Sequence, residues 1–327
     1  MVEPLLEVEN LRVEFFTPSG PLCAVDDVSF TIGRGEIVGL AGESGSGKST
    51  IAQAILRILQ PPAIITGGAV RFEGEDLLGM SSAELDRVRW SQIALVFQSA
   101  MNALSPVMRI GEQIADVIVA HGQGTWAEAL ERAADMLTLV GIDRDRLRSY
   151  PHELSGGMRQ RVMIAVALVL KPKLLMMDEP TTALDVVVQK EILAQIRELK
   201  DELGFSVLFI THDLPLMLEL TDRLAILYGG RLAEMAPTSE LIADAQHPYT
   251  RGLLASSPAL FGPRSELSGI AGSPPNLRSL PSGCRFHPRC GEVLDRCRED
   301  SPELLPLGTA PRVSPHLAAC HLLGAAS

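Results

Sequence analysis

A glycine-rich stretch near the N-terminus constrains the fold of this chain more than any other feature of its sequence. The segment Gly42–Ser49 has the sequence GESGSGKS, which fits the phosphate-binding pattern G-x-x-x-x-G-K-[ST]. An apolar run at 36–41 precedes it and predicts a buried strand, and the pattern at 51–59 predicts a helix after it. A strand, a glycine-rich loop and a helix in this order predict a binding site for ATP or GTP.

The residue types of this segment, which we call the phosphate loop, explain the prediction. Glycines at 42, 45 and 47 let backbone N–H groups turn inward around phosphates. Lys48 supplies a positive charge to the outer phosphates, and the Ser49 hydroxyl can bind Mg²⁺. The candidate nucleotide-binding residues are Gly42, Glu43, Ser44, Gly45, Ser46, Gly47, Lys48, Ser49 and the following Thr50.

A second motif is an apolar strand that ends in two carboxylates. Residues 174–179 have the sequence LLMMDE. At a strand end beside the phosphate loop, Asp178 would hold the magnesium shell and Glu179 would polarise a water toward the outermost phosphate. On its own, the motif is equally well explained by a buried strand with solvated acids at its end. Together with the phosphate loop, it favours nucleotide hydrolysis.

The order of the predicted elements indicates the fold class. From 173 to 227, strand patterns alternate with helix patterns, which predicts an α/β fold with a mainly parallel sheet and right-handed crossovers. The segment of about 99–170 is predicted as an all-helical insert. A stretch at 257–281 is rich in Ser, Pro and Gly and predicts an extended connection to a small C-terminal segment that contains most of the cysteines.

The composition narrows the class of protein. Apolar residues make up 46% and charged residues 21% of the chain, which excludes wholesale disorder. The formal net charge is −11 and there is no basic stripe, so the sequence argues against a nucleic-acid partner. The longest uninterrupted apolar run, 162–170, is much shorter than the roughly 20 residues of a membrane-spanning helix. The N-terminus shows no secretory signal, so we expect a cytosolic protein.

A third motif carries a resemblance to a known family. The segment Leu154–Met158, LSGGM, is followed by Arg159-Gln160-Arg161 and resembles the signature of ABC-type ATPases. The motifs stand in that family's order: the phosphate loop, Gln98 after ALVF, LSGGM, LLMMDEP, Ala183-Leu184-Asp185, and His212 after VLFI. The resemblance covers residues 5–235. It implies a P-loop NTPase fold with an antiparallel β subdomain and a helical insert at about 99–170.

The resemblance also implies a head-to-tail dimer that holds two ATP molecules, each between the phosphate loop of one subunit and the signature of the other. Ser155, Gly156 and Gly157 lie at a predicted helix N-terminus and would hold the γ-phosphate of the nucleotide bound across the interface. Asp185 would communicate across the dimer.

Three further positions match nucleotide contacts of the family. His212 would contact the γ-phosphate, and Gln98 would reach the magnesium or the attacking water. Phe15 matches the aromatic position that stacks on adenine, although the adjacent Phe16 could serve, and an ordinary core aromatic would also explain Phe15. The implied magnesium contacts are Ser49, Gln98 and Asp178.

A narrower resemblance covers nearly all of the remaining chain. Three parts look like the ATPase subunits of bacterial oligopeptide and dipeptide importers: Met101, Leu104, Pro106 and Gly111 after Gln98; HPYTRGLL at 247–254; and PSGCRFHPRC at 281–290. One departure is Ser105, where relatives often carry Asn. The resemblance implies a nucleotide-binding domain at 1–235 and an importer-type C-terminal segment at 236–327, which we call the extension.

The implied function is ATP hydrolysis that powers the import of peptides through two separately encoded membrane-spanning permease subunits. One phosphate loop is present, so a second ATPase subunit, identical or related, is needed. An extracytoplasmic solute-binding protein would be an indirect partner. The chain would lie peripherally on the cytoplasmic face of the membrane, with the part of the insert around 101–113 docked on a membrane subunit.

Other functions stay open at this point. Relatives of these importers carry nickel or other small solutes. Soluble ABC ATPases of ribosome or DNA machinery usually fuse two ATPase units or insert a long coiled coil, and this acidic chain does neither. A mainly regulatory or metal-sensing role of the extension is a further alternative.

Four cysteines of the extension, Cys284, Cys290, Cys297 and Cys320, have the spacing C-x5-C-x6-C-x22-C. A reducing cytosol disfavours disulfides, and the C-x2-C pairs of zinc fingers are missing. Four widely spaced thiolates suit a [4Fe–4S] cluster, and some peptide-importer ATPases resemble this chain in carrying one in this extension. The neighbouring His287, His316 and His321 keep a Zn²⁺ site open, and structural thiols without metal are the third possibility.

Overall fold

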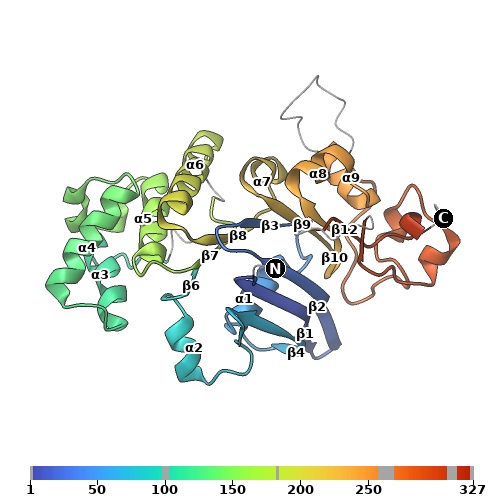
Figure 1. Ribbon diagram of the computed structural model, residues 1–327, viewed down its shortest axis with the longest axis horizontal. Coiled ribbons are helices and arrows are strands. Elements are labelled where there is room, and N and C mark those ends of the chain that lie inside the picture. Colours follow the sequence, from blue (N-terminus) through green and yellow to red (C-terminus); the bar gives the residue numbers. More distant parts are fainter. Residues whose placement is uncertain (1–2, 98–102, 182–183, 257–268, 308–314, 325–327) are drawn as a thin grey trace. The chain divides into compact units, whose positions relative to one another are not determined.

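The computed structural model describes residues 3–97, 103–181, 184–256, 269–307 and 315–324 of the chain (Figure 1). Its contacts separate two compact units. The first unit contains residues 1–33, 37–79 and 210–327, and the second contains residues 34–36 and 80–209. The N-terminal strands and the extension thus belong to the same unit.

An antiparallel sheet forms the N-terminal part of the first unit. Its strands lie in the order β2-β1-β4-β5. Their bounds are Leu6–Thr17 for β1, Gly20–Ile32 for β2, Ala63–Phe72 for β4 and Glu75–Asp76 for β5. Val8 of β1 lies opposite Phe30 of β2 and Val70 of β4, and all three side chains are buried. The expected antiparallel β subdomain is therefore present.

The remaining strands of the first unit lie in the order β11-β12-β10-β9-β3. Their bounds are Ile37–Ala41 for β3, Arg223–Tyr228 for β9, Arg231–Pro237 for β10, Leu305–Pro306 for β11 and Leu317–Ala318 for β12. The helices of this unit are α1 (Lys48–Ile55), α7 (Leu214–Leu220), α8 (Thr238–Asp244) and α9 (Pro248–Ala255), with 3₁₀ turns at His287–Arg289, Asp295–Arg298 and His321–Gly324.

These strands form a mixed arrangement, whereas the sequence predicts a mainly parallel sheet with a tight hairpin turn at Gly229-Gly230. Strands β3 and β9 are parallel, whereas β9, β10, β12 and β11 pair antiparallel. The turn Gly229-Gly230 explains the reversal, because both glycines have positive φ values, 55° and 88°, which suit a two-residue hairpin. The pairing of β12 with β10 brings the last described segment of the extension into register with the strands before it.

Parallel strands and a helical layer make up the second unit. Its strands β6 (Ile93–Val96), β7 (Leu174–Asp178) and β8 (Ser206–Ile210, whose last residue falls in the first unit) lie in the order β8-β7-β6. Strands β6 and β7 are parallel. The helices are α2 (Ser82–Val88), α3 (Ile110–Ala120), α4 (Trp126–Leu139), α5 (Gly156–Leu168) and α6 (Val186–Leu203), with 3₁₀ turns at Arg144–Arg148 and Pro151–Glu153.

Helices α3, α4 and α5 pack on one another and form the insert that the sequence predicts at about 99–170 (Figure 1). Residues 98–102, at the start of that range, lie outside the described residues. Across the described ranges, no helix combines the length and the apolar character that crossing a membrane requires.

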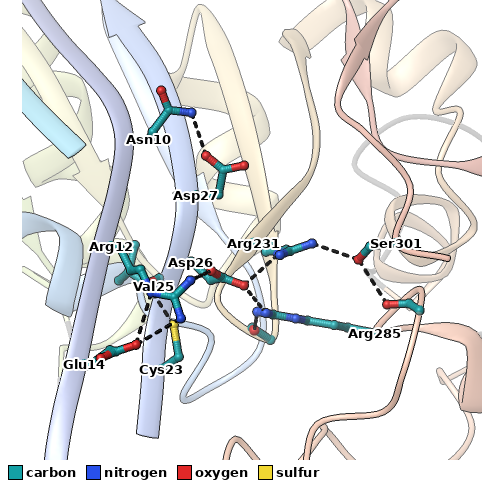
Figure 2. A network of polar contacts seen from close by, with 12 residues as sticks. Asn10, Arg12, Glu14, Cys23, Val25, Asp26, Asp27, Arg231, Arg285 and Ser301 are labelled. Carbon is teal, nitrogen blue, oxygen red and sulfur yellow. Dashed lines mark hydrogen bonds and ion pairs between the residues drawn. The ribbon is translucent and has the colours of Figure 1, made fainter. Parts of the chain in front are cut away.

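Asp26 of β2 is the centre of a polar network that connects the extension to the N-terminal strands (Figure 2). It is 4% exposed, and its carboxylate accepts hydrogen bonds from Arg12 at 2.7 Å, from Arg231 at 2.8 Å and from Arg285. Burial by itself raises the pKa of Asp26, but the charges of Arg231 and Arg285 outweigh it and lower that pKa overall. The ionised carboxylate therefore holds residue 285 beside β2.

Glu234 of β10 is a second buried acid with partners in the extension. It is fully buried, and its carboxylate accepts the backbone N–H groups of Gln246 at 2.7 Å and His247 at 3.0 Å. The Nε2 atom of His316 lies 2.6 Å from the same carboxylate. Burial raises the pKa of Glu234, but the hydrogen bond from His316 and the others lower it overall. The charge of Glu234 is thus stabilised by groups from the segment just after α8 and by His316 just before β12.

Candidate functional site

The phosphate loop lies between β3 and α1 in the first unit. Gly42 and Gly47 have φ values of 143° and 104°, which residues with a side chain rarely adopt. A Cβ at Gly42 would collide with the backbone oxygen of Leu227, and a Cβ at Gly47 would lie 2.5 Å from the carbonyl oxygen of Ala24. The two glycines therefore let the loop run close against the neighbouring strands.

Lys48, the first residue of α1, points its ammonium group into this loop. The side chain is nearly buried, and Nζ donates hydrogen bonds to the carbonyl oxygens of Gly42 at 2.8 Å and Glu43 at 3.0 Å. Nζ also lies 3.4 Å from the Ser46 hydroxyl. An ammonium group and the positive end of a helix at one place favour a bound anion. The arrangement suits the outer phosphates of a nucleotide.

Two residues of the extension contact the phosphate loop at Glu43. The Glu43 N–H donates a hydrogen bond to the hydroxyl of Tyr249, and the Glu43 carboxylate accepts two hydrogen bonds from Arg289. Reasoning from the sequence assigned no role to either residue. Both residues lie in segments that carry the narrower resemblance, Tyr249 in HPYT and Arg289 in HPRC. The sequence thus singled out these segments, but it did not indicate that they contact the phosphate loop.

The other site residues of the first unit lie on separate elements. Phe15 is half-buried in β1, opposite Leu22 of β2 and Ala63 of β4. The adjacent Phe16 is 48% exposed. His212 follows β8 and is exposed.

In the second unit, strand β7 ends at the two candidate carboxylates. Asp178 is its last residue and is 4% exposed. Glu179 follows with a φ of 51°, in the left-handed region that non-glycine residues seldom occupy. Strained backbone of this kind clusters at functional sites. The chain thus turns sharply at the residue that the sequence predicts to activate water.

The signature segment lies at the N-terminus of α5, also in the second unit. Ser155 is the N-cap, and its hydroxyl accepts a hydrogen bond from the N–H of Met158 at 3.3 Å. A Cβ at Gly157 would lie 2.8 Å from a methyl carbon of Val188 on α6, so glycine permits close packing of the two helices. The backbone N–H groups of Gly156 and Gly157 stand at the positive end of α5.

Two further residues position the signature segment and the start of α6. Arg159 donates from Nε to the carbonyl oxygens of Pro151 at 2.8 Å and Leu154 at 3.1 Å, which fixes the chain before α5. Asp185 is the N-cap of α6, where its carboxylate accepts the N–H groups of the next turn. Gln98, the remaining predicted site residue, lies outside the described residues.

The four cysteines of the extension are free thiols. Burial, together with Cys297, Cys320 and Cys290 nearby, raises the pKa of Cys284 to about 11, and burial raises the pKa of Cys290 and Cys320 as well. Among the residues that the structure describes, no three His, Cys, Asp or Glu side chains are grouped to hold a metal ion. The expected iron–sulfur cluster is therefore not supported, and neither is the Zn²⁺ alternative with His287, His316 and His321.

Comparison with known proteins yields two family matches. The family described as "ABC transporter" matches residues 25–182, and the family described as "Oligopeptide/dipeptide transporter, C-terminal region" matches residues 233–297. The first range contains the phosphate loop and the signature segment. The second contains both residues that contact Glu43 from the extension.

Individual relatives match almost end to end. The chain is 44% identical over 304 residues to the oligopeptide transport ATP-binding protein AppD of Bacillus subtilis, a match that covers 92% of this chain and 93% of that protein. It is 45% identical over 300 residues to the oligopeptide transport ATP-binding protein OppD of Salmonella typhimurium, with coverages of 91% and 89%.

Solved structures show the same fold. The structure is similar to a dimeric ATP-binding cassette described in a post-hydrolysis state bound to ADP and phosphate, with a TM-score of 0.64 and 28% sequence identity. The match covers 71% of this chain and 98% of that one.

Proposed function

The chain belongs to the family of oligopeptide and dipeptide transport ATP-binding proteins of ABC transporters, and we propose that it hydrolyses ATP to power the import of peptides through separately encoded membrane subunits. The observation that carries this proposal is the geometry of the phosphate loop. Lys48 points into the loop at the start of α1, in a chain whose two parts match the two parts of such an ATPase.

ATP binding is assigned to the phosphate loop and β1. Lys48 and the backbone N–H groups of the loop bind the β- and γ-phosphates, whose negative charge they offset. The Ser49 hydroxyl and the Asp178 carboxylate are oxygen donors of the kind Mg²⁺ takes, and we assign both to the magnesium ion of the nucleotide. Phe15 stacks on the adenine, with Phe16 as the neighbouring candidate.

Hydrolysis transfers the γ-phosphoryl group to water. Glu179 accepts a proton from the attacking water, whose oxygen forms a bond to phosphorus while the bond from phosphorus to the ADP oxygen breaks. His212 contacts the γ-phosphate, and Gln98 contacts the magnesium or the water. Lys48 offsets the charge that develops on the leaving ADP.

A second ATPase subunit completes each site. The Ser155 hydroxyl and the N–H groups of Gly156 and Gly157 bind the γ-phosphate held by the partner, at a helix N-terminus that favours an anion. Asp185 transmits the state of one site to the other. The dimeric cassette described above supports this assembly.

The other partners are assigned from the family. Two permease subunits receive the motion of the ATPase dimer, through the part of the insert around 101–113, and a solute-binding protein delivers the peptide outside. Residues 1–235 act as the nucleotide-binding domain and residues 236–327 as the extension. The chain acts at the cytoplasmic face of the membrane and binds no nucleic acid.

The proposed function includes no metal cluster. The [4Fe–4S] assignment of Cys284, Cys290, Cys297 and Cys320 stays a hypothesis from the sequence, because the described structure groups no three ligands. Iron and zinc analysis of protein purified without oxygen measures it directly.

Uptake in the native cell tests the proposed function. Deletion of the gene should abolish uptake of labelled di- and oligopeptides, and the wild-type gene should restore it. A gene with Glu179→Gln should not, although its product is present at the same level. Restored peptide uptake with Glu179→Gln, or a deletion that stops nickel uptake and leaves peptide uptake intact, would contradict the proposal.

A further inference from the structure

Glu43, the second residue of the phosphate loop, is held by the extension at both its backbone and its side chain. Its N–H donates a hydrogen bond to the Tyr249 hydroxyl at 3.0 Å. Its carboxylate accepts hydrogen bonds from both terminal nitrogens of Arg289, at 2.7 Å from Nη1 and 3.0 Å from Nη2. The partners stand 206 and 246 residues away in the sequence. The residues that hold Glu43 therefore lie far outside the phosphate-loop motif in the sequence.

Arg289 is held on several sides. Its side chain is 6% exposed, and Nε donates a hydrogen bond to the carbonyl oxygen of Ala271 at 2.8 Å. The guanidinium lies over the rings of Tyr228 and Phe286, 5.8 and 6.0 Å from their centres. The hydrogen bond to Glu43 raises the pKa of Arg289, which stays charged. A guanidinium already fixed in this way loses little freedom when it pairs with a carboxylate.

The same aromatic cluster supports the second contact. Tyr249 is fully buried, and its ring centre lies 4.5 Å from that of Tyr228 and 5.4 Å from that of Phe286. The Tyr249 N–H donates a hydrogen bond to Nδ1 of His247 at 3.0 Å, which fixes the start of α9. Both residues that contact Glu43 are thus part of one packed group.

The charge of Glu43 makes this group relevant to ATP. A carboxylate on the loop that binds a polyanion repels it, and at 23% side-chain exposure water screens the repulsion only partly. Two parallel hydrogen bonds from a guanidinium neutralise that charge and fix the carboxylate. Without Arg289, the loop would face the phosphates with an uncompensated negative charge.

We propose that Arg289 is a positioning residue for ATP binding: it holds and neutralises Glu43, and through it the extension sets the affinity of the phosphate loop for nucleotide. The inference rests on the proposed function, because it assumes that the phosphate loop binds ATP.

Titration of the purified full-length chain with ADP and with a non-hydrolysable ATP analogue tests the proposal. Arg289→Ala should weaken binding of the ATP analogue by about 10-fold, within the usual range of coupling between sites. The loss should be smaller for ADP, which carries less charge. In ATPase assays the KM for ATP should rise, while kcat at saturating ATP stays within about twofold, since Arg289 is absent from the chemical step.

Two further variants separate the charge effect from a loss of packing. In the double variant Arg289→Ala with Glu43→Gln, the neutral amide needs no cation, so most of the lost affinity should return. Arg251→Ala is the matched control. It breaks an ion pair of the same extension, Arg251–Glu292 at 2.9 Å, whose side chains are 45% and 50% exposed, and it should leave ATP affinity unchanged.

Arg289→Lys covers the case in which the alanine variant does not fold. It keeps the charge but loses the two-pronged geometry, and it should weaken the ATP analogue by about two- to threefold. Wild-type affinity in Arg289→Ala, or in Arg289→Lys where alanine does not fold, would overturn the proposal. So would a double variant no better than Arg289→Ala. A wild-type chain that binds no ATP would instead overturn the proposed function itself.

Discussion

The phosphate loop and the signature segment are both glycine-rich and both lead into a helix, but they are held in different ways. The signature segment is positioned by its own neighbours: Ser155 caps the N–H of Met158, and Arg159 holds carbonyl oxygens within eight residues. The phosphate loop is positioned in part by Tyr249 and Arg289, more than 200 residues away.

The difference concerns which parts of the chain must fold first. A segment fixed by neighbours within eight residues adopts its shape whenever its helix forms. A loop fixed by distant residues reaches its final shape only after the extension has packed against it. The signature should therefore be insensitive to changes in the extension, and the phosphate loop should not.

Glu179→Gln should have the largest effect on ATP hydrolysis and should leave the phosphate loop and the signature segment intact. The amide cannot accept a proton from water, so ATP hydrolysis should fall on the order of 10²-fold or more while ATP still binds and holds the dimer closed. ATPase rates and gel filtration with ATP measure the two outcomes. Turnover near the wild-type rate would refute the role of Glu179.

Lys48→Ala should damage only the phosphate loop. It removes a charge from the phosphates and also the hydrogen bonds that Nζ donates to Gly42 and Glu43, so affinity for ATP should fall by about 10-fold or more. Titration with an ATP analogue measures the loss. Lys190→Ala, on α6, is a control for the loss of one positive charge, and unchanged affinity in Lys48→Ala would count against the phosphate-loop assignment.

A fall in pH should destabilise the extension around His247. The Nδ1 atom of this residue accepts a hydrogen bond from Tyr249, one of the two residues that hold the phosphate loop. Burial lowers the pKa of His247 to about 4, against about 6.5 in the unfolded chain, so between these values the unfolded state binds more protons. The free energy of unfolding should therefore fall as pH drops from 6.5 to 4, by roughly 3 kcal/mol in total. His247→Asn, which keeps a capping side chain, should flatten this slope.

Urea unfolding at several pH values measures the slope. The exposed His152→Asn serves as the control and should keep the wild-type dependence. If His247→Asn also keeps that dependence, another group is responsible for the acid sensitivity.

Ser155→Ala should have the smallest effect and should act on the signature alone. Loss of the cap should lower the free energy of unfolding by about 1 kcal/mol and reduce hydrolysis by the dimer, while a single chain binds ATP as before. Ser155→Thr keeps a capping hydroxyl and should retain stability. If Ser155→Ala reduced the ATP affinity as much as Lys48→Ala does, the phosphate loop and the signature segment would not be independent.

Much of the fold follows from local patterns in the sequence. The strand before Gly42, the strand that ends at Asp178 and the helical insert all show the expected periodicity. The pairing of β11 and β12 did not follow from such patterns, because these strands have only two residues each and their pairing depends on contacts with β10.

The residues of the candidate site show the same difference between local motifs and long-range contacts. Lys48, Ser155 and Glu179 belong to short motifs with a defined spacing, so the sequence could propose roles for them. The contact of Arg289 with Glu43 spans 246 residues and has no local pattern. The cysteines show the opposite case, because their spacing suggests a metal site but the described residues group no three ligands, so the [4Fe–4S] assignment stays a prediction.

Three acidic side chains of the strands and the phosphate loop each take a basic partner from beyond residue 280: Asp26 pairs with Arg285, Glu43 with Arg289, and Glu234 with His316. These three pairs constrain how the two parts of the gene can be inherited. A recombination event or a chimaera that joined residues 1–235 to a foreign extension without these three bases would leave acids with too few partners, two of them buried. The two parts of the gene are therefore expected to be exchanged together, and a lasting change at one member of a pair to be accompanied by a change at the other.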